Sequence, residues 1–238
     1  MTERATMTGQ LNSALRIDPA VTAVLAIDMH RGHLDPSIAT MPVAAEIATG
    51  VVESSRRLLA ATRDVGIPTA FLVMQNRYIN GRSEYLRNPW WQAVEDARES
   101  LTPELPSTIS GHNLVGSPQT EVMPELAPGS NDIVITTKHR LSSFIDTDLE
   151  SWLRVRRVQT LLLIGINTNT CVQCAAFEAF NRDYAAIVVS DCVHSMYGVD
   201  LHEFALQNVA RCCGWVLSTD DVITKLGADV GMGSNSAD

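Results

Sequence analysis

Cys171 is the residue of this chain best placed for nucleophilic chemistry. It lies in TLLLIGINTNTCVQCAAF, residues 160–177, where an apolar run gives way to a segment with helical spacing. The preceding TNT residues are typical helix caps, and the unpaired N–H groups of a first helical turn stabilise negative charge. Because the thiolate is the nucleophilic form of cysteine, this position predicts a reactive thiol. The alternative is a buried, inert cysteine, the commonest state of this residue type.

Two charged residues also follow apolar runs. Asp28 comes near the end of AVLAIDM, residues 23–29, and Lys138 directly follows DIVITT, residues 132–137. A carboxylate in such a place suits a general base that takes the thiol proton and passes it to a leaving amine. A lysine between a thiol and a carboxylate would favour their charged forms. Taken singly, Asp28 could be a loop cap and Lys138 a surface lysine, so their value depends on whether the fold brings them together.

The other cysteines and the histidines give weaker signals. Cys171 and Cys174 form a C-x-x-C that could indicate redox or zinc chemistry, but Cys212 and Cys213 are adjacent rather than spaced as ligands. Five cysteines crowded into the last third do not suit a disulfide framework. The six histidines are dispersed, with no H-x-x-x-H motif. We therefore predict neither a metal ion nor a cofactor, and keep a thiol redox protein as an alternative.

The elements that must position these residues can be read from the apolar pattern. Continuous apolar runs, rather than alternating ones, are typical of parallel strands that are covered on both faces. Segments with helical spacing lie between them. We predict one α/β domain over residues 1–238, with three αβα layers and a doubly wound, mostly parallel six-stranded sheet. The expected strands are 23–29, 68–75, 132–137, 160–166, 185–191 and 215–219, and the expected helices are 44–66, 146–158, 171–184 and 201–214.

Ligands of an open parallel sheet bind beyond the carboxyl ends of its strands. That edge would carry Asp28, Gln75, Asn76, Lys138 and residues 167–171. The interval 77–128 is rich in Gly, Pro and irregular sequence, which favours a lid, substrate or interface segment without another structural layer. Its Trp90 and Trp91 would either close over the pocket or, as we prefer, bury against a second subunit. The small, polar tail from about residue 227 is expected to be frayed.

The bulk composition limits the partners. The chain has 27 acidic and 18 basic residues and a net charge of -9, which argues against a nucleic-acid partner. No apolar segment reaches the roughly 20 residues that cross a bilayer, and the first 18 residues do not resemble a signal peptide. We expect no membrane contact, a cytoplasmic location and a small-molecule substrate.

The motifs AIDMHRGHLDP, TKHRLSSF and GINTNTCVQCAAFEAFNRDYAAIVVSDCV resemble the isochorismatase-like cysteine hydrolase superfamily over about residues 20–220. The last carries the superfamily's G-x-x-T-[ND]-x-C-V signature. The resemblance implies Asp28 as acid/base, Lys138 as electrostatic partner and Cys171 as nucleophile. It also implies a cis peptide between Ile166 and Asn167, with the Asn167 and Cys171 amides as oxyanion hole.

The retained cysteine points to one branch of that superfamily, similar to N-carbamoylsarcosine amidase and ureidoacrylate hydrolase. Isochorismatases proper generally lack the cysteine, and nicotinamidases carry a D-x-H motif where this chain reads MQNRYING. The resemblance thus implies hydrolysis of a small amide or ureide through a thioester, with ammonia released, by a homo-dimer or homo-tetramer. Nicotinamidase-type and isochorismate-type hydrolysis remain alternatives. The expected substrate-binding residues are Gln75, Asn76, Arg77, Phe144, Trp90 and Trp91.

Overall fold

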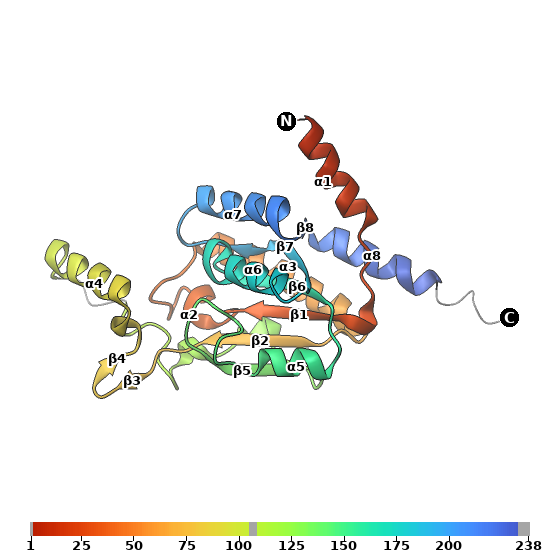
Figure 1. The fold of residues 1–238 in the computed structure, drawn as a ribbon. Helices are drawn as coiled ribbons and strands as arrows, with labels where there is room; N and C mark the ends of the chain where they lie inside the picture. The colour runs from red at the N-terminus through yellow and green to blue at the C-terminus, as the bar shows by residue number, and fades with distance from the viewer. Residues whose placement is uncertain (1, 105–108, 233–238) are drawn as a thin grey trace.

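A parallel sheet of six strands forms the centre of the protein, in the order β5-β2-β1-β6-β7-β8, and confirms the predicted fold class (Figure 1). The computed structural model describes residues 2–104 and 109–232. All neighbouring strands of this sheet pair in parallel. Its strands are β1 (Thr22–Ile27), β2 (Thr69–Met74), β5 (Ile133–Lys138), β6 (Thr160–Ile166), β7 (Ala185–His194) and β8 (Trp215–Leu217).

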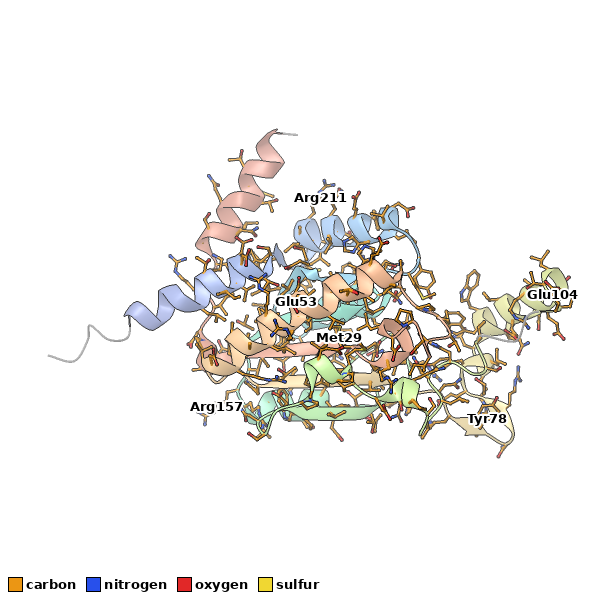
Figure 2. The ribbon with its side chains drawn as sticks, turned by 180° about the vertical axis from the view of Figure 1, so that it is seen from behind. Met29, Glu53, Tyr78, Glu104, Arg157 and Arg211 are labelled. Atoms are coloured by element: carbon orange, nitrogen blue, oxygen red, sulfur yellow. The ribbon has the colours of Figure 1, made fainter. Side chains whose placement is uncertain are left out.

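Helices cover both faces of the sheet. The strands β1 and β6 are therefore buried along their whole length. Alternate residues of β1 belong to two separate apolar clusters: Val24 packs in one with Leu58, and Leu25 packs in the other with Ala176. Figure 2 shows the first face from its helical side. The helices of that face are α3 (Ala45–Asp64) and α8 (Thr219–Met232), and those of the other are α5 (Leu149–Val155), α6 (Gln173–Phe180) and α7 (Val199–Cys212).

The strand order reverses direction at β1, which lies between β2 and β6. Such a reversal opens a crevice beyond the carboxyl ends of the strands. The β6 backbone approaches β1 unusually closely there: Gly165 has φ 131°, and a Cβ at this position would overlap the carbonyl oxygen of Ile27. Only glycine fits this contact.

Regular structure in the interval 77–128 overturns the prediction of an irregular segment. Asn88 caps helix α4 by accepting hydrogen bonds from the Trp90 and Trp91 amides, and Pro89 occupies the first helical position. Residues 78–101, here called the arm, extend beyond the carboxyl ends of the strands, and Tyr78 labels its hairpin in Figure 2. The elements of the interval are β3 (Tyr78–Ile79), β4 (Arg82–Ser83), η2 (Tyr85–Arg87), α4 (Pro89–Leu101), η3 (Pro118–Thr120) and η4 (Pro124–Leu126).

The two ends of the chain also differ from expectation. α8 continues to Met232, so the prediction of a frayed tail is wrong for residues 227–232; residues 233–238 lie outside the described part. Three further elements were not predicted. They are α1 (Thr2–Ala14), η1 (Pro19–Val21) and α2 (Arg31–Leu34). Within the described residues, no helix is both long and apolar enough to cross a membrane.

Candidate active site

Asp28 lies at the first residue after β1, where the chain turns sharply. Its φ of 55° is in the left-handed region, which non-glycine residues adopt only when their surroundings hold them there. Two bonds to β2 supply that support: the Asp28 amide donates to the Leu72 carbonyl at 2.8 Å, and the Met74 amide donates to Asp28 Oδ1 at 2.9 Å. The carboxyl group is thus fully buried and fixed in orientation.

Lys138, the last residue of β5, reaches this carboxylate from two strands away. Its register partner on the intervening strand is Met74, and its side chain is completely buried. The Nζ atom donates to Asp28 Oδ2 at 2.7 Å and to Cys171 Sγ at 3.4 Å. The three residues that the sequence singled out therefore meet at the carboxyl edge of the sheet.

Cys171 is held by an irregular turn that follows β6. Residues Thr168–Val172 form a π-helical turn, and the peptide between Ile166 and Asn167 is cis, as the family resemblance implied. The expected side-chain cap is absent from this turn: Asn167, at the capping position, makes no such bond, and its Oδ1 accepts from the Met196 amide at 2.9 Å instead. The Asn167 side chain thus ties the turn to the loop after β7.

A two-part cavity leads from the surface to Cys171. The outer chamber has a volume of about 550 Å³, and the inner chamber, about 40 Å³, touches the Cys171 side of the turn. Met41, Met74, Tyr85, Trp91 and Tyr197 are among the side chains that line both. A space of the inner size holds roughly one small polar group, whereas the outer size is typical of ligand pockets. A larger hollow of about 840 Å³ borders residues 16–22 and 156–158, at the opposite ends of the strands, and includes none of the three site residues.

Comparisons with known proteins show which family this chain belongs to. A family model described as the isochorismatase domain matches residues 22–221. A ureidoacrylate amidohydrolase, RutB, of Methylobacterium radiotolerans is 32% identical over 216 residues, which cover 85% of this chain and 78% of that protein. The corresponding protein of Stutzerimonas stutzeri is also 32% identical, over 87% of this chain and 83% of its own.

This chain belongs to the isochorismatase family. Solved structures share the fold of this isochorismatase-family chain. A cysteine hydrolase from Pseudomonas syringae pv. phaseolicola superposes with a TM-score of 0.73 at 24% identity, covering 90% of this chain and 96% of that one. N-carbamoylsarcosine amidase from Thermoplasma acidophilum superposes with a TM-score of 0.63 at 23% identity, covering 84% and 96%. At these identities the likeness shows the fold alone.

At this isochorismatase-family site, burial opposes the thiolate form of Cys171 that the sequence position favoured. Burial raises the pKa of the Cys171 thiol to about 12; the nearby Lys138 ammonium lowers it, but the Asp28 carboxylate raises it again. Burial alone would lower the pKa of Lys138, yet the charge of the Asp28 carboxylate and the hydrogen bonds to Asp28 and Cys171 leave that pKa above its usual value. Deprotonation of Cys171 must therefore accompany its attack on a substrate.

Of the predicted substrate-binding residues, Trp90 and Trp91 line the cavity and the others do not. Asn76 is buried. Its side-chain amide donates to the Ser110 carbonyl and accepts a hydrogen bond from the Ser83 hydroxyl, so it points into the protein. Phe144 is a core residue, with the Arg182 guanidinium 4.3 Å above its ring. Gln75 and Arg77 also lie outside the lining.

Arg77 instead anchors the arm to the body of the protein. Its guanidinium binds both carboxylate oxygens of the buried Glu84, at 2.8 and 3.0 Å. Two residues that follow β5 approach the same carboxylate, His139 at 3.9 Å and Arg140 at 3.6 Å. The hydrogen bonds from Arg77 are the main reason that the pKa of Glu84 is lowered.

Several cavity residues carried no signal in the sequence. Tyr85 and His112 lie in the irregular interval, and Met41, Leu141 and Tyr197 lie in loops. The histidines are dispersed along the chain, but the fold gathers three of them: the His33 ring lies 5.1 Å from that of His30 and 4.9 Å from that of His112. His33 and His112 line the inner chamber. Within residues 2–104 and 109–232, no group of three His, Cys, Asp or Glu is arranged to hold a metal ion.

Proposed function

We propose that this protein is a cysteine-dependent amidohydrolase that cleaves a C–N bond of a small amide or N-carbamoyl compound and releases ammonia. The single observation that carries the proposal is the bridge from Lys138 Nζ to both Asp28 Oδ2 and Cys171 Sγ. It couples a nucleophile to a proton carrier. The relatives named ureidoacrylate amidohydrolase, at 32% identity over most of both chains, support the same chemistry.

The proposed reaction has two halves. Cys171 Sγ attacks the substrate carbonyl carbon while its proton passes to the Asp28 carboxylate; the protonated Asp28 then gives that proton to the leaving nitrogen, which departs as ammonia. Water attacks the resulting thioester as Asp28 takes its proton. The C–S bond breaks, the acid is released, and the proton returns to the sulfur. Lys138 balances the negative charge of Asp28 throughout, and both side chains are fully buried.

The oxygen of the tetrahedral intermediate needs donors as well. We assign this role to the backbone amides of Asn167 and Cys171, at the two ends of the turn that presents the thiol. Fixed amides aimed at a developing oxyanion are worth roughly 10²-fold or more in rate.

The direct test is ammonia release across ureides, N-carbamoyl amino acids and primary amides, together with intact-mass detection of the thioester. Cys171→Ala should abolish both signals. Cys212→Ala is the matched control, because that thiol is exposed and does not line the two-part cavity. Ammonia release that survives in a folded Cys171→Ala protein would rule the mechanism out.

The organisation of the enzyme is part of this proposal. We infer one domain over residues 1–238 that assembles as a homo-dimer or homo-tetramer; large apolar side chains exposed on α6 and α7, Phe180 and Phe204, support an apolar contact between copies. All five cysteines are free, as in a reducing cytoplasm. Light scattering on a sizing column gives the assembly state.

A further inference from the structure

The cavity next to Cys171 has little positive charge. Among the described residues that line its two chambers, Arg140 is the only arginine or lysine. Its guanidinium donates to the His139 carbonyl at 2.8 Å and lies 3.6 Å from the carboxylate of Glu84. The side chain is half exposed, at the outer rim. Arg140 therefore already faces an anion and does not reach the inner chamber.

Three other arginines, all outside the lining of the cavity, are engaged with other groups of the protein. Arg77 pairs with Glu84, and Arg31 pairs with Asp35 and Glu121. Arg82 donates to the Leu86 carbonyl and to Gln92. None of the three lines either chamber.

The two histidines of the inner chamber do not supply positive charge. Burial lowers the pKa of His33 and lowers that of His112 well below its ordinary value, so both rings are neutral at pH 7. The His112 ring is also occupied, with Nδ1 at 2.8 Å from the Thr40 hydroxyl and Nε2 accepting from the Asn113 amide at 3.0 Å. A carboxylate placed beside these rings would lose its hydration without gaining an ionic partner.

Most of the remaining surface is apolar. Met41, Met74, Trp91 and Leu141 line both chambers, and Val94 and Leu201 extend the apolar wall of the outer one. A volume of about 550 Å³ with such walls accommodates a ring or a branched chain.

Tyr85 adds one polar group to this wall. The side chain is 4% exposed and lines both chambers, and its hydroxyl has no well-formed hydrogen bond within the described residues. The Asn113 side chain lies close enough to interact with it, yet Asn113 Oδ1 is also without a partner. A buried hydroxyl in this state costs free energy that a ligand atom can recover. The phenol is a neutral donor, since burial raises its pKa well above the ordinary value.

From these contacts we infer the substrate class of the site: an amide or ureide whose acyl group is uncharged, ring-sized and apolar, with one acceptor atom bound by the Tyr85 hydroxyl. This inference rests on the proposed function. It separates this chain from relatives named for ureidoacrylate, whose substrate carries a carboxylate.

The first experiment compares pairs of substrates of similar shape, in which one member carries a carboxylate and the other is uncharged. Ammonia release is measured for ureidoacrylate against its methyl ester, and for 3-carboxybenzamide against 3-acetylbenzamide. The neutral member of each pair is expected to have the higher kcat/KM, by about tenfold or more. A preference for the anion would overturn the inference. Arg140→Gln should leave turnover of the neutral members unchanged; selective loss of turnover of the anions would identify Arg140 as a carboxylate site and also overturn it.

The second experiment tests the hydroxyl. Tyr85→Phe should raise KM for 3-acetylbenzamide by about threefold to tenfold more than it raises KM for benzamide, because only the acetyl oxygen is bound by the phenol. Tyr78→Phe, on the exposed hairpin of the same arm, is the matched control. Equal KM values for the wild type and Tyr85→Phe would contradict the assignment.

Cys171→Ala run in parallel separates the two levels of inference. If turnover depends on Cys171 but is faster for the anions, the inferred substrate class is wrong and the proposed function stands. If no substrate releases ammonia in a Cys171-dependent reaction, the substrate class and the proposed function are both wrong.

Discussion

Lys138 Nζ lies 2.7 Å from Asp28 Oδ2, and neither side chain is exposed to solvent. The two charges cancel within the protein. A thiolate on Cys171 would add an uncompensated negative charge to the same volume, which is why the sulfur stays protonated until a substrate is attacked. The pair therefore sets both the stability and the reactivity of the site.

Removal of one partner should be costly. Lys138→Met leaves the Asp28 carboxylate buried without its cation, and we expect the free energy of unfolding to fall by about 3–5 kcal/mol. Asp28→Asn/Lys138→Met removes both charges and should recover a large part of that loss. Urea denaturation of the two variants measures the difference. A double variant less stable than Lys138→Met would show that the loss does not come from an unpaired charge.

Asp28→Asn should separate thiol reactivity from catalysis. Asp28 raises the pKa of Cys171 and Lys138 lowers it, so the variant should react faster with iodoacetamide at Cys171 while ammonia release is lost. In the wild type, the exposed Cys212 should be alkylated before Cys171. Peptide mass spectrometry over time follows both sites. Slower alkylation of Cys171 in the variant would contradict this account of the electrostatics.

Gly165→Ala should disrupt the junction of β1 and β6. The new Cβ would overlap the Ile27 carbonyl oxygen, one residue before Asp28, at a φ that alanine rarely adopts. We expect the free energy of unfolding to fall by about 2 kcal/mol or more, as it does at other strained or overpacked sites. Gly50→Ala is the control, because that glycine lies in the exposed part of α3 with nothing within 4 Å; it should stabilise the protein by about 0.4–1 kcal/mol. Thermal melts of the two variants should thus move in opposite directions.

Mild acid should destabilise the protein through its buried histidines. Burial lowers the pKa of His30, His33 and His112, and lowers that of His202 from 6.5 to about 4. The unfolded chain then binds protons that the folded one does not, so the stability present above pH 6.5 is lost as pH falls toward 4. Urea unfolding at pH 7 and pH 5 measures this loss. His202→Gln should reduce the difference, whereas an identical slope in the variant would exclude His202 as a contributor.

The sheet was predictable because its strands carry a simple signal. The run TLLLIGI has no charged residue and is apolar after Thr160, and β6 is buried at every position, so the pattern and the structure have one physical cause. The convergence of Asp28, Lys138 and Cys171 followed from strand direction, since parallel strands end at one edge. That much needs no knowledge of side-chain contacts.

The arm and the pocket wall were not predictable in the same way. Helix α4 has one buried side chain, Glu95, and its apolar residues Trp90, Trp91 and Val94 line the outer chamber instead of packing into the core. Asn76 and Phe144 lie near the site along the chain, but their neighbours turn them inward. Tyr85, His112 and Cys171 line one chamber because of long-range packing, and no local sequence pattern encodes such packing.

The arm contributes Tyr85, Trp90 and Trp91 to the pocket wall, while the reacting groups come from the ends of β1 and β5 and from the turn after β6. The arm therefore supplies part of the pocket wall and none of the three reacting side chains. An exchange of residues 78–101 for those of a relative should alter which amide is accepted and leave Asp28, Lys138 and Cys171 in the protein.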